Sequence, residues 1–504
     1  MQPDNRPNDA DDADDTATGA EQAAIEPAPL PTYIRRNLRT IRASSFAAAA
    51  GTGLVFALPS AWTWFLDQDL QPGQGTVIGG TFVAITGLIA YTGTHQSRRS
   101  TERIAADKNT LDTTNADRAH DLTVTQELRA RFVTIAAQFA DPSPEIRLAG
   151  VYALEALTDD WLDRGAHHEA QTCINYYCGY LTRPYTPPTE HPHLRQTVVT
   201  PDAATTIQRT YTHPHDDLHI RQIITRIIAA HTQPGHHHRW SRYDYDFSRA
   251  YFKDLSFDES VFERLALFTQ AHFHGALTSF RDTRFDGGLT SFQDAQFHGK
   301  TTSFTRARFR GKTTTFAQSQ FFSETSLFRG ALFESEQQTL FSGSRFYGDL
   351  TTFNDSRFHS DQTSFAKAHF RSSLRTEFRG ARFYGERTSF DDAWFHSNQT
   401  LMDGAWFHSK LHTCFDNTQF HGDSTLFDDA NIKGKATTFL SAEFHSRVTL
   451  FRGVKFKSIT SFKRPRVWIN VYFDWDPQIP YAVSAPKPVT VLPEEWPPTV
   501  VGMA

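Results

Sequence analysis

Histidine offers the most chemistry in this chain of 504 residues, which contains 23 of them. Imidazole rings bind transition metals and change charge close to neutral pH. Three consecutive histidines, His236, His237 and His238, follow Pro234 and Gly235 directly. This cluster predicts either a metal site or an ordinary solvated loop, and the loop is the simpler interpretation.

A second set of histidines recurs at a regular interval. His396, His421 and His445 each stand one place after a large apolar residue, and four such apolar positions separate each histidine from the next. If four positions make one turn of a stacked coil, the three rings form an outward column about 4.8 Å apart. The column could act as a pH-sensitive or metal-binding strip. The alternative is an exposed polar ladder, which is favoured because no carboxylate or cysteine recurs in the same column.

Motifs of the common enzyme classes are absent from the sequence. It has no GxxxxGK, no GxGxxG after a strand, no GxSxG, no HExxH and no CxxC. The three cysteines, Cys173, Cys178 and Cys414, lack the spacing of a zinc site and are too few for a disulfide framework, so they fit a reducing compartment. We therefore predict a protein that is not an enzyme and that needs no cofactor.

A long repeat must position the histidine column. Between Phe280 and Phe462 a large apolar anchor returns after alternating steps of five and seven residues. Of the 31 anchors 29 are Phe, with Met402 and Ile432 as substitutes, and the residue two places earlier is Ala, Ser or Thr in 30 cases. The anchors that we expect to form the structural core include Phe280, Phe285, Phe292, Phe297, Phe304, Phe309, Phe316, Phe321, Phe353 and Phe358.

The spacing predicts stacked extended segments. Steps of five and seven do not keep one face of a 3.6-residue helix, whereas a solenoid buries one large residue beside a small one in every repeat. Gly or Ser stands two places after each anchor that opens a seven-residue step, from Gly275 to Ser458, which suits tight corners. No proline occurs between Pro234 and Pro465, as a ladder of backbone N–H groups requires. The predicted fold class is an all-β solenoid.

The start of the repeat resembles the pentapeptide-repeat family. SerArgAlaTyrPhe at 248–252 fits the family pattern A(D/N)LXX, and Phe247, Phe252, Phe257 and Phe262 keep strict five-residue spacing. The resemblance implies a right-handed quadrilateral β-helix with four anchors per coil. The 37 anchors from Phe247 then give about nine coils and a rod about 43 Å long. The sequence departs from the family by adding two or three residues to alternate steps.

Two uncharged stretches near the N-terminus predict a membrane hairpin. Residues 1–32 form an acidic segment that we expect to be disordered, and residues 43–66 and 76–94 are each long enough to cross a bilayer as a helix. Arginines flank the pair on both outer sides but not in the short loop between them, so the positive-inside rule places both termini in the cytoplasm. The alternative is a buried core helix or a cleaved signal peptide.

Helical patterns connect the membrane hairpin to the repeat. Residues 100–125 predict a juxtamembrane linker helix, and residues 126–232 predict a small α-helical unit with HEAT-like packing. Residues 184–215 within it read as a loop. The repeat is expected over residues 247–462, followed by an aromatic cap and a Pro-rich tail over 463–504. Residues 147–157 and this order of parts resemble actinobacterial membrane-anchored pentapeptide-repeat proteins.

Two functions fit this organisation. The first is a membrane-anchored cytoplasmic scaffold whose rod binds an unknown protein partner. The alternative is a regulatory or sensory module that responds to a ligand, pH or metal through the helical unit or the histidine column. Some family members mimic duplex DNA, but 26 Lys and Arg against 23 Asp and Glu make this rod nearly neutral, so neither that role nor nucleic-acid binding is expected. Family rods often dimerise end to end, which leaves a homodimer open.

Overall fold

The computed structural model describes residues 74–185, 197–202, 205–210, 217–476 and 485–501. The chain divides into two units, residues 1–118 and 119–504, and each is described by itself. The predicted acidic tail 1–32 and the first predicted span, 43–66, lie outside the described residues.

Helix α2 (Gln74–Phe139) contains 66 residues and crosses the boundary between the two units. It includes the second predicted span and the predicted linker helix 100–125, which is helical but continuous with its neighbours rather than a separate element. Among the residues that the structure describes, no helix is both long enough and apolar enough to cross a membrane. Most side chains of residues 76–89 are not among those described, and the two-span hairpin stays a prediction.

Three further helices form the predicted α-helical unit: α3 (Pro144–Asp163), α4 (His167–Leu181) and α5 (Leu218–Thr232). Helix α3 begins after the predicted break, because Pro144 suits the first helical position and the Ser143 hydroxyl accepts a hydrogen bond from the Ile146 N–H. Phe139 of α2 packs edge-on against Tyr180 of α4. Helix α4 contacts strand β3 and α5 contacts β4, so this unit continues directly into the solenoid.

The predicted loop 184–215 was wrong in part. Strands β1 (Thr197–Asp202) and β2 (Thr205–Thr210) pair in antiparallel register within it. The run of Thr197, Val198, Val199 and Thr200 explains the difference, since β-branched residues favour extended backbone.

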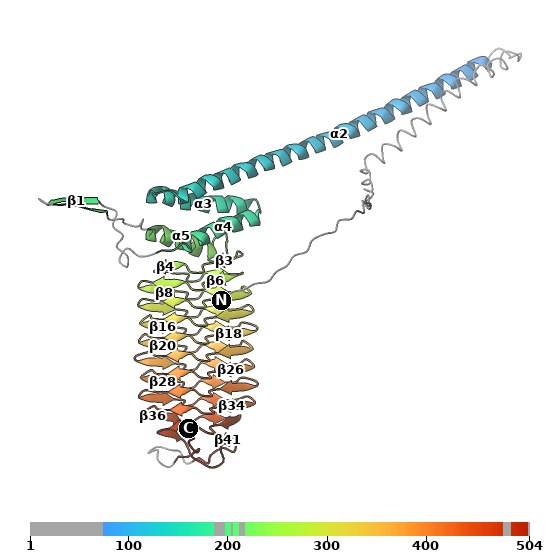
Figure 1. Ribbon diagram of the computed structural model, residues 1–504. Helices are drawn as coiled ribbons and strands as arrows, with labels where there is room; N and C mark the ends of the chain where they lie inside the picture. The colour runs from blue at the N-terminus through green and yellow to red at the C-terminus, as the bar shows by residue number, and fades with distance from the viewer. Residues whose placement is uncertain (1–73, 186–196, 203–204, 211–216, 477–484, 502–504) are drawn as a thin grey trace, which may run out of the picture. The chain divides into compact units, whose positions relative to one another are not determined.

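Four parallel sheets build the solenoid, and successive strands along the chain belong to successive sheets (Figure 1). Sheet I consists of β3 (Tyr245–Asp246), β6 (Ala266–Leu267), β10 (Leu289–Ser291), β14 (Thr313–Thr315), β18 (Gln338–Leu340), β22 (Gln362–Ser364), β26 (Arg387–Ser389), β30 (His412–Cys414), β34 (Ala436–Thr438), β38 (Ile459–Ser461) and β41 (Val491–Leu492). Sheet II consists of β4 (Tyr251–Lys253), β7 (His272–His274), β11 (Gln296–Phe297), β15 (Gln320–Phe321), β19 (Arg345–Phe346), β23 (His369–Phe370), β27 (Trp394–Phe395), β31 (Gln419–Phe420), β35 (Glu443–Phe444) and β39 (Val467–Trp468).

The other two sheets lie opposite these in the coil. Sheet III consists of β8 (Leu277–Ser279), β12 (Thr301–Ser303), β16 (Thr325–Leu327), β20 (Leu350–Thr352), β24 (Arg375–Glu377), β28 (Gln399–Leu401), β32 (Ser424–Leu426), β36 (Val448–Phe451) and β40 (Val471–Phe473). Sheet IV consists of β5 (Val261–Phe262), β9 (Arg284–Phe285), β13 (Arg308–Phe309), β17 (Leu332–Phe333), β21 (Arg357–Phe358), β25 (Arg382–Phe383), β29 (Trp406–Phe407), β33 (Asn431–Ile432) and β37 (Lys455–Phe456).

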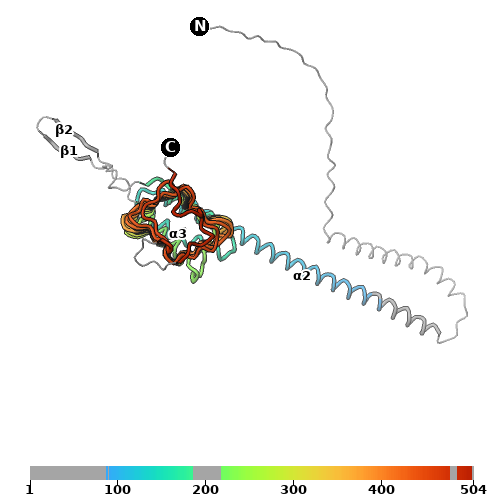
Figure 2. The backbone as a smooth tube through the Cα atoms, turned by 90° about the horizontal axis from the view of Figure 1, so that it is seen from below, coloured from blue at the N-terminus to red at the C-terminus, as the bar shows by residue number. Residues whose placement is uncertain are grey.

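The predicted anchors form the core of this rod. Viewed along its axis, the coils superpose around a closed four-sided outline (Figure 2). Phe309 is fully buried and lies parallel to Phe285 and Phe333, with ring centroids 5.0 and 4.9 Å apart. The substitutes Met402 and Ile432 are buried in the same way. The four-sided solenoid is confirmed and has about ten turns, one more than the nine predicted, while its right-handed sense stays a prediction.

Contacts at the corners explain the Gly and Ser rule, and several of the glycines have positive φ as expected. In the seven-residue steps the Ser side chain points inward and its hydroxyl bonds a buried Thr hydroxyl 21 residues earlier, rather than its own backbone. These Thr–Ser pairs are Thr302–Ser323, Thr314–Ser335, Thr339–Ser360, Thr351–Ser372, Thr376–Ser397, Thr388–Ser409 and Thr425–Ser446, at 2.6 to 2.8 Å. Each pair satisfies two buried hydroxyls that would otherwise cost stability.

Glycine at such a corner cannot be replaced freely. Gly311 has φ +105°, and a Cβ there would lie 1.9 Å from the carbonyl oxygen of Gly287. We expect Gly311→Ala to lower the free energy of unfolding by at least about 2 kcal/mol, because the clash is with backbone and the conformation is strained. Gly288→Ala is the control, since a Cβ at Gly288 meets nothing within 4 Å and its φ is not in the left-handed region. Equal urea midpoints for the two variants would contradict this account.

The C-terminal end differs from the predicted boundary at residue 462. Strands β39, β40 and β41 add a further coil, in which Phe473 stacks on Phe451 at 4.6 Å. Trp468 takes the next anchor position and Trp496 packs edge-on against Phe473 at 4.9 Å. Aromatic side chains thus pack at this end of the rod, and part of the expected tail is a strand because β41 pairs with β38.

Candidate functional site

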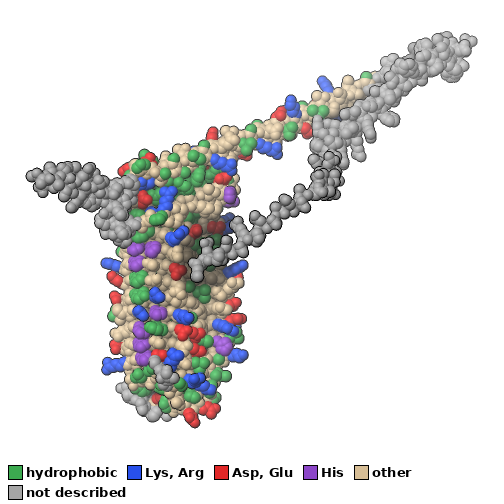
Figure 3. All heavy atoms as spheres, viewed as in Figure 1, with side chains coloured by type: hydrophobic (Ala, Val, Ile, Leu, Met, Phe, Trp, Pro, Cys, Tyr) green, Lys and Arg blue, Asp and Glu red, His purple; other side chains and the backbone are tan. Residues whose placement is uncertain are grey.

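The outer faces of the sheets carry the side chains that could meet a partner. In a strand successive side chains point to opposite faces, so the residues on either side of each buried anchor point outward. Strict coil-to-coil register then stacks them in two columns per sheet. The rod from 247 to 462 has ten histidines, and seven of them lie on the outer face of sheet II: His272, His274, His298, His369, His396, His421 and His445. Figure 3 shows histidines gathered in a column along one side of the rod.

The predicted histidine column exists in this sheet. The ring centroids of His396 and His421 lie 4.1 Å apart, and those of His421 and His445 lie 4.3 Å apart with an interplanar angle of 8°. His445 Nε2 lies 3.1 Å from a carboxylate oxygen of Glu443, whereas Nε2 of His421 is buried without a hydrogen-bond partner. The column therefore holds one imidazole nitrogen in an unsatisfied environment.

The column extends further than the sequence indicated. His274, His298, Phe322 and Tyr347 occupy the same position in earlier coils, with successive centroids 4.7, 4.7 and 5.0 Å apart and nearly parallel rings. Arg371 separates them from His396. The rule that found His396, the place after every fourth anchor, would have found this upper part if aromatic residues had been followed together with histidine.

Burial, and after it repulsion from neighbouring positive groups, lowers the pKa of several imidazoles on this face. Burial, and after it the neighbouring rings of His396 and His445, lowers the pKa of His421 to about 4, while Glu443 raises it slightly. Burial, followed by His298, His272 and Lys253, lowers the pKa of His274 to about 4 as well. The rings of His274 and His421 therefore stay uncharged at neutral pH and become cationic only in acid.

We expect the rod to lose stability as the pH falls from about 6.5 to 4. The ordinary pKa of histidine is about 6.5, so between these values the unfolded chain binds protons that the folded column excludes. The stabilisation is complete above pH 6.5 and is lost as pH falls through this window. Urea unfolding at pH 7.5, 5.5 and 4.5 measures it, and His421→Phe, which copies Phe322 in the same column, should flatten the dependence. Identical pH profiles for the two proteins would contradict the assignment.

The metal interpretation gains no support. In the described part of the chain, no group of three or more His, Cys, Asp or Glu residues is arranged to hold a metal ion. This applies to His396, His421 and His445 and equally to His236, His237 and His238. The latter three do not form a simple solvated loop either, because only His237 is exposed.

His231 and His238 belong to a cluster with carboxylates of α3, which the sequence did not reveal. His231 is 2% exposed, stacks on buried Trp240 at 4.0 Å, and places Nε2 3.0 Å from Glu155. His238 places Nδ1 3.2 Å from Asp159 and Nε2 3.0 Å from Asp163. The three carboxylates are spaced by four residues on one face of α3, a signal that sequence reasoning could have used.

Hydrogen-bond geometry assigns the charge of these rings. Nδ1 of His231 lies 2.9 Å from the backbone oxygen of His238, and a carbonyl oxygen can only accept a hydrogen bond. A hydrogen bond from Nε2 to the ionised Glu155 then requires a second proton on the His231 ring. The same count applies to His238 between its two carboxylates. Burial raises the pKa of Asp159, although His231, Trp240 and His238 oppose this.

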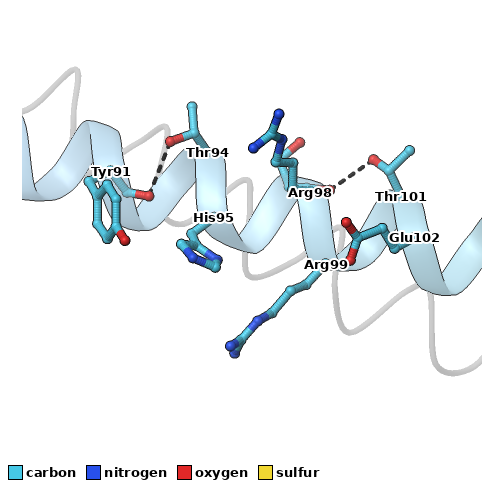
Figure 4. Close-up of a pocket in the computed structure, with 8 residues that line it drawn as sticks. Tyr91, Thr94, His95, Arg98, Arg99, Thr101 and Glu102 are labelled. Carbon is cyan, nitrogen blue, oxygen red and sulfur yellow. Dashed lines mark hydrogen bonds between the residues drawn. The ribbon is translucent and has the colours of Figure 1, made fainter.

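None of the pockets lined by described residues is a closed cavity. A shallow depression on α2 is lined, among described residues, by side chains between Tyr91 and Glu102, all from one helix, and Figure 4 shows them projecting from its surface. The hydroxyls of Thr94 and Thr101 donate hydrogen bonds to backbone oxygens one turn earlier. Nothing in this depression resembles an active site.

The four sheets and their buried anchors define a β-solenoid repeat protein. Residues 247–296 match a family described as pentapeptide repeats, in 9 copies. The same rod architecture continues beyond the matched residues to β41. Comparison with curated proteins and with solved structures found no significant match. The match and the four stacked sheets together show a repeat protein with a β-solenoid fold.

Proposed function

We propose that this protein is a scaffold whose rod presents its outer faces to a partner protein. The supporting observation is the contrast between an almost uniform Phe core and outward columns that differ from sheet to sheet. Sheet II carries the histidine and aromatic columns, whereas the outward residues of sheets I and III are mostly Ser, Thr, Gln and Leu. A rigid ladder holds these side chains at fixed spacing, which lowers the entropic cost of binding.

The proposal includes a membrane anchor formed by residues 43–66 and 76–94, with both chain ends in the cytoplasm. Its support is the sequence alone, namely two uncharged stretches and the arginines outside them. Resistance of the full chain to extraction at alkaline pH tests it. Release of the chain into the soluble fraction would refute the membrane anchor. The scaffold proposal would then be tested separately, by identifying the partner proteins.

Proximity labelling in cells tests the scaffold, with the labelling enzyme fused after Ala504. We expect a small recurrent set of neighbouring proteins that is lost when Phe309→Asp destroys the rod. Phe309→Leu, which keeps a large apolar anchor, is the matched control and should retain the set. Neighbours that do not depend on an intact rod would refute the scaffold.

A second candidate function is regulation by pH, and the cluster around His231 favours it. His231 of α5 and His238 of the loop that leads into β3 both contact carboxylates of α3, so a change in the charge of these rings would alter the contacts that hold α5 and this loop to α3. Amide exchange of α5, compared between pH 6 and pH 8.5, tests this candidate. Unchanged protection would exclude a regulatory role for the cluster.

A further inference from the structure

Sheet IV carries a strip of positive charge that the nearly neutral composition of the rod conceals. Five strands from β21 to β37 place Arg357, Arg382, Lys433, Lys455 and Lys457 in the two outward columns. No Asp or Glu stands in these two columns over the five coils. Four steps of about 4.8 Å make this basic strip about 19 Å long.

The cations of the basic strip differ from those at the neighbouring corner. Between sheets III and IV, Arg379 pairs with Asp403 at 3.1 Å and Arg452 pairs with Asp428, each one coil away. Among described residues, no carboxylate lies within ion-pair distance of the five strip cations. The rod thus neutralises its corner and leaves the adjacent face charged.

Like charges in directly stacked positions repel one another. Arg357 and Arg382 are partners in the strand register, and Lys433 precedes Lys457 by one coil. Such pairs cost stability in a free sheet. An anionic occupant would relieve this repulsion.

We propose that the basic strip binds an extended acidic segment of a partner protein. The inference rests on the proposed scaffold function and names the chemistry of its partner. An extended chain rises about 3.3 Å per residue, so six to eight residues span the strip and present three or four carboxylates to it. Arg and Lys bind carboxylates through charge-assisted hydrogen bonds, which are about twice as strong as neutral ones.

The length and the surroundings of the strip favour a short peptide over a nucleic acid or a lipid leaflet. Continuing along sheet IV toward the N-terminus, the columns contain Glu334 and Asp286, which pair with Arg310 at 3.1 Å and Arg284 at 2.8 Å, so the run of unpaired cations is interrupted there. In the corner toward sheet I, exposed Asp361 and Glu386 lie beside two coils of the strip and Lys410 and Lys435 beside the next two, so a flat anionic membrane would meet carboxylates as well as cations. A chain one residue wide avoids these carboxylates.

Fluorescence anisotropy with the full chain and a labelled octaglutamate peptide tests the proposal. We expect saturable binding at low ionic strength that weakens with added salt. Replacing all five strip cations by Gln should weaken it at least tenfold. The control removes five positive charges elsewhere and should bind within twofold of the unaltered chain: Lys253, Lys300, Arg345, Lys367 and Arg371, each changed to Gln.

The remaining outcomes decide between partners. Equal loss in both five-Gln variants would mean that net charge alone attracts the peptide, and the proposal would fail. Tighter binding of decathymidylate than of octaglutamate, lost in the strip variant, would assign the strip to nucleic acid instead. Proximity labelling with the strip variant distinguishes failure of the scaffold proposal from failure of the strip proposal. If rod-dependent neighbours persist without the strip cations, the protein is still a scaffold but binds its partner through another face.

Discussion

Phe309→Asp is expected to unfold the middle of the rod and to lower the free energy of unfolding by more than about 5 kcal/mol. The substitution removes a fully buried ring that stacks on Phe285 and Phe333 and meets Phe316 edge-on at 5.7 Å. Loss of a buried Phe side chain costs about 3–5 kcal/mol, and a carboxylate in its place adds a desolvation penalty. Because each coil completes its core only against its neighbours, the damage should spread along the stack.

Urea unfolding followed by circular dichroism, together with limited proteolysis, measures this effect. We expect new cleavage sites in the coils next to Phe309 and a lower midpoint. Phe309→Leu is the conservative control and should cost no more than about 2 kcal/mol, since Met402 and Ile432 already show that aliphatic anchors fit. A Phe309→Asp protein within 1 kcal/mol of the parent would mean that the stacked rings do not hold the rod.

Much of the fold could be predicted because the alternation of large and small residues is visible within each short repeat. Anchor spacing and the small residue two places earlier are both read within one step of the repeat, and the structure buries the anchors from Phe280 to Phe321 as expected. The end of the rod could not be read in this way. Strand β41 pairs with β38 across roughly 30 residues of sequence, and Trp468 replaces the usual Phe. A long-range pairing leaves no periodic signal.

Among the outward side chains, too, periodic features could be predicted from the sequence and long-range ones could not. The column of His396, His421 and His445 could be predicted because it recurs every four anchors. The basic strip was missed because a net charge averages over all four sheets, whereas Arg357 and Lys455 matter through the face they share. The cluster around His231 was missed because its carboxylate partner Glu155 lies 76 residues earlier and no local rule joins them.

In the cluster around His231, we expect Glu155→Leu to destabilise the helical unit by about 2–4 kcal/mol. The His231 ring is 2% exposed and bears a proton on both nitrogens, so removal of Glu155 leaves a buried charge with only Asp159, at 3.7 Å, to compensate it. Asp163→Asn is the matched control. It weakens a contact to His238 in which the Asp163 side chain is 64% exposed, so less than about 1 kcal/mol is expected.

A double-variant cycle separates the charge from the packing. His231→Phe keeps a flat ring to stack on Trp240, and Glu155→Leu with His231→Phe replaces the ion pair by apolar groups of similar size. If the loss in Glu155→Leu comes from an uncompensated imidazolium, the double variant should be more stable than Glu155→Leu alone. Losses that simply add would show that His231 is neutral in the folded chain, and the assignment of two protons to its ring would then be wrong.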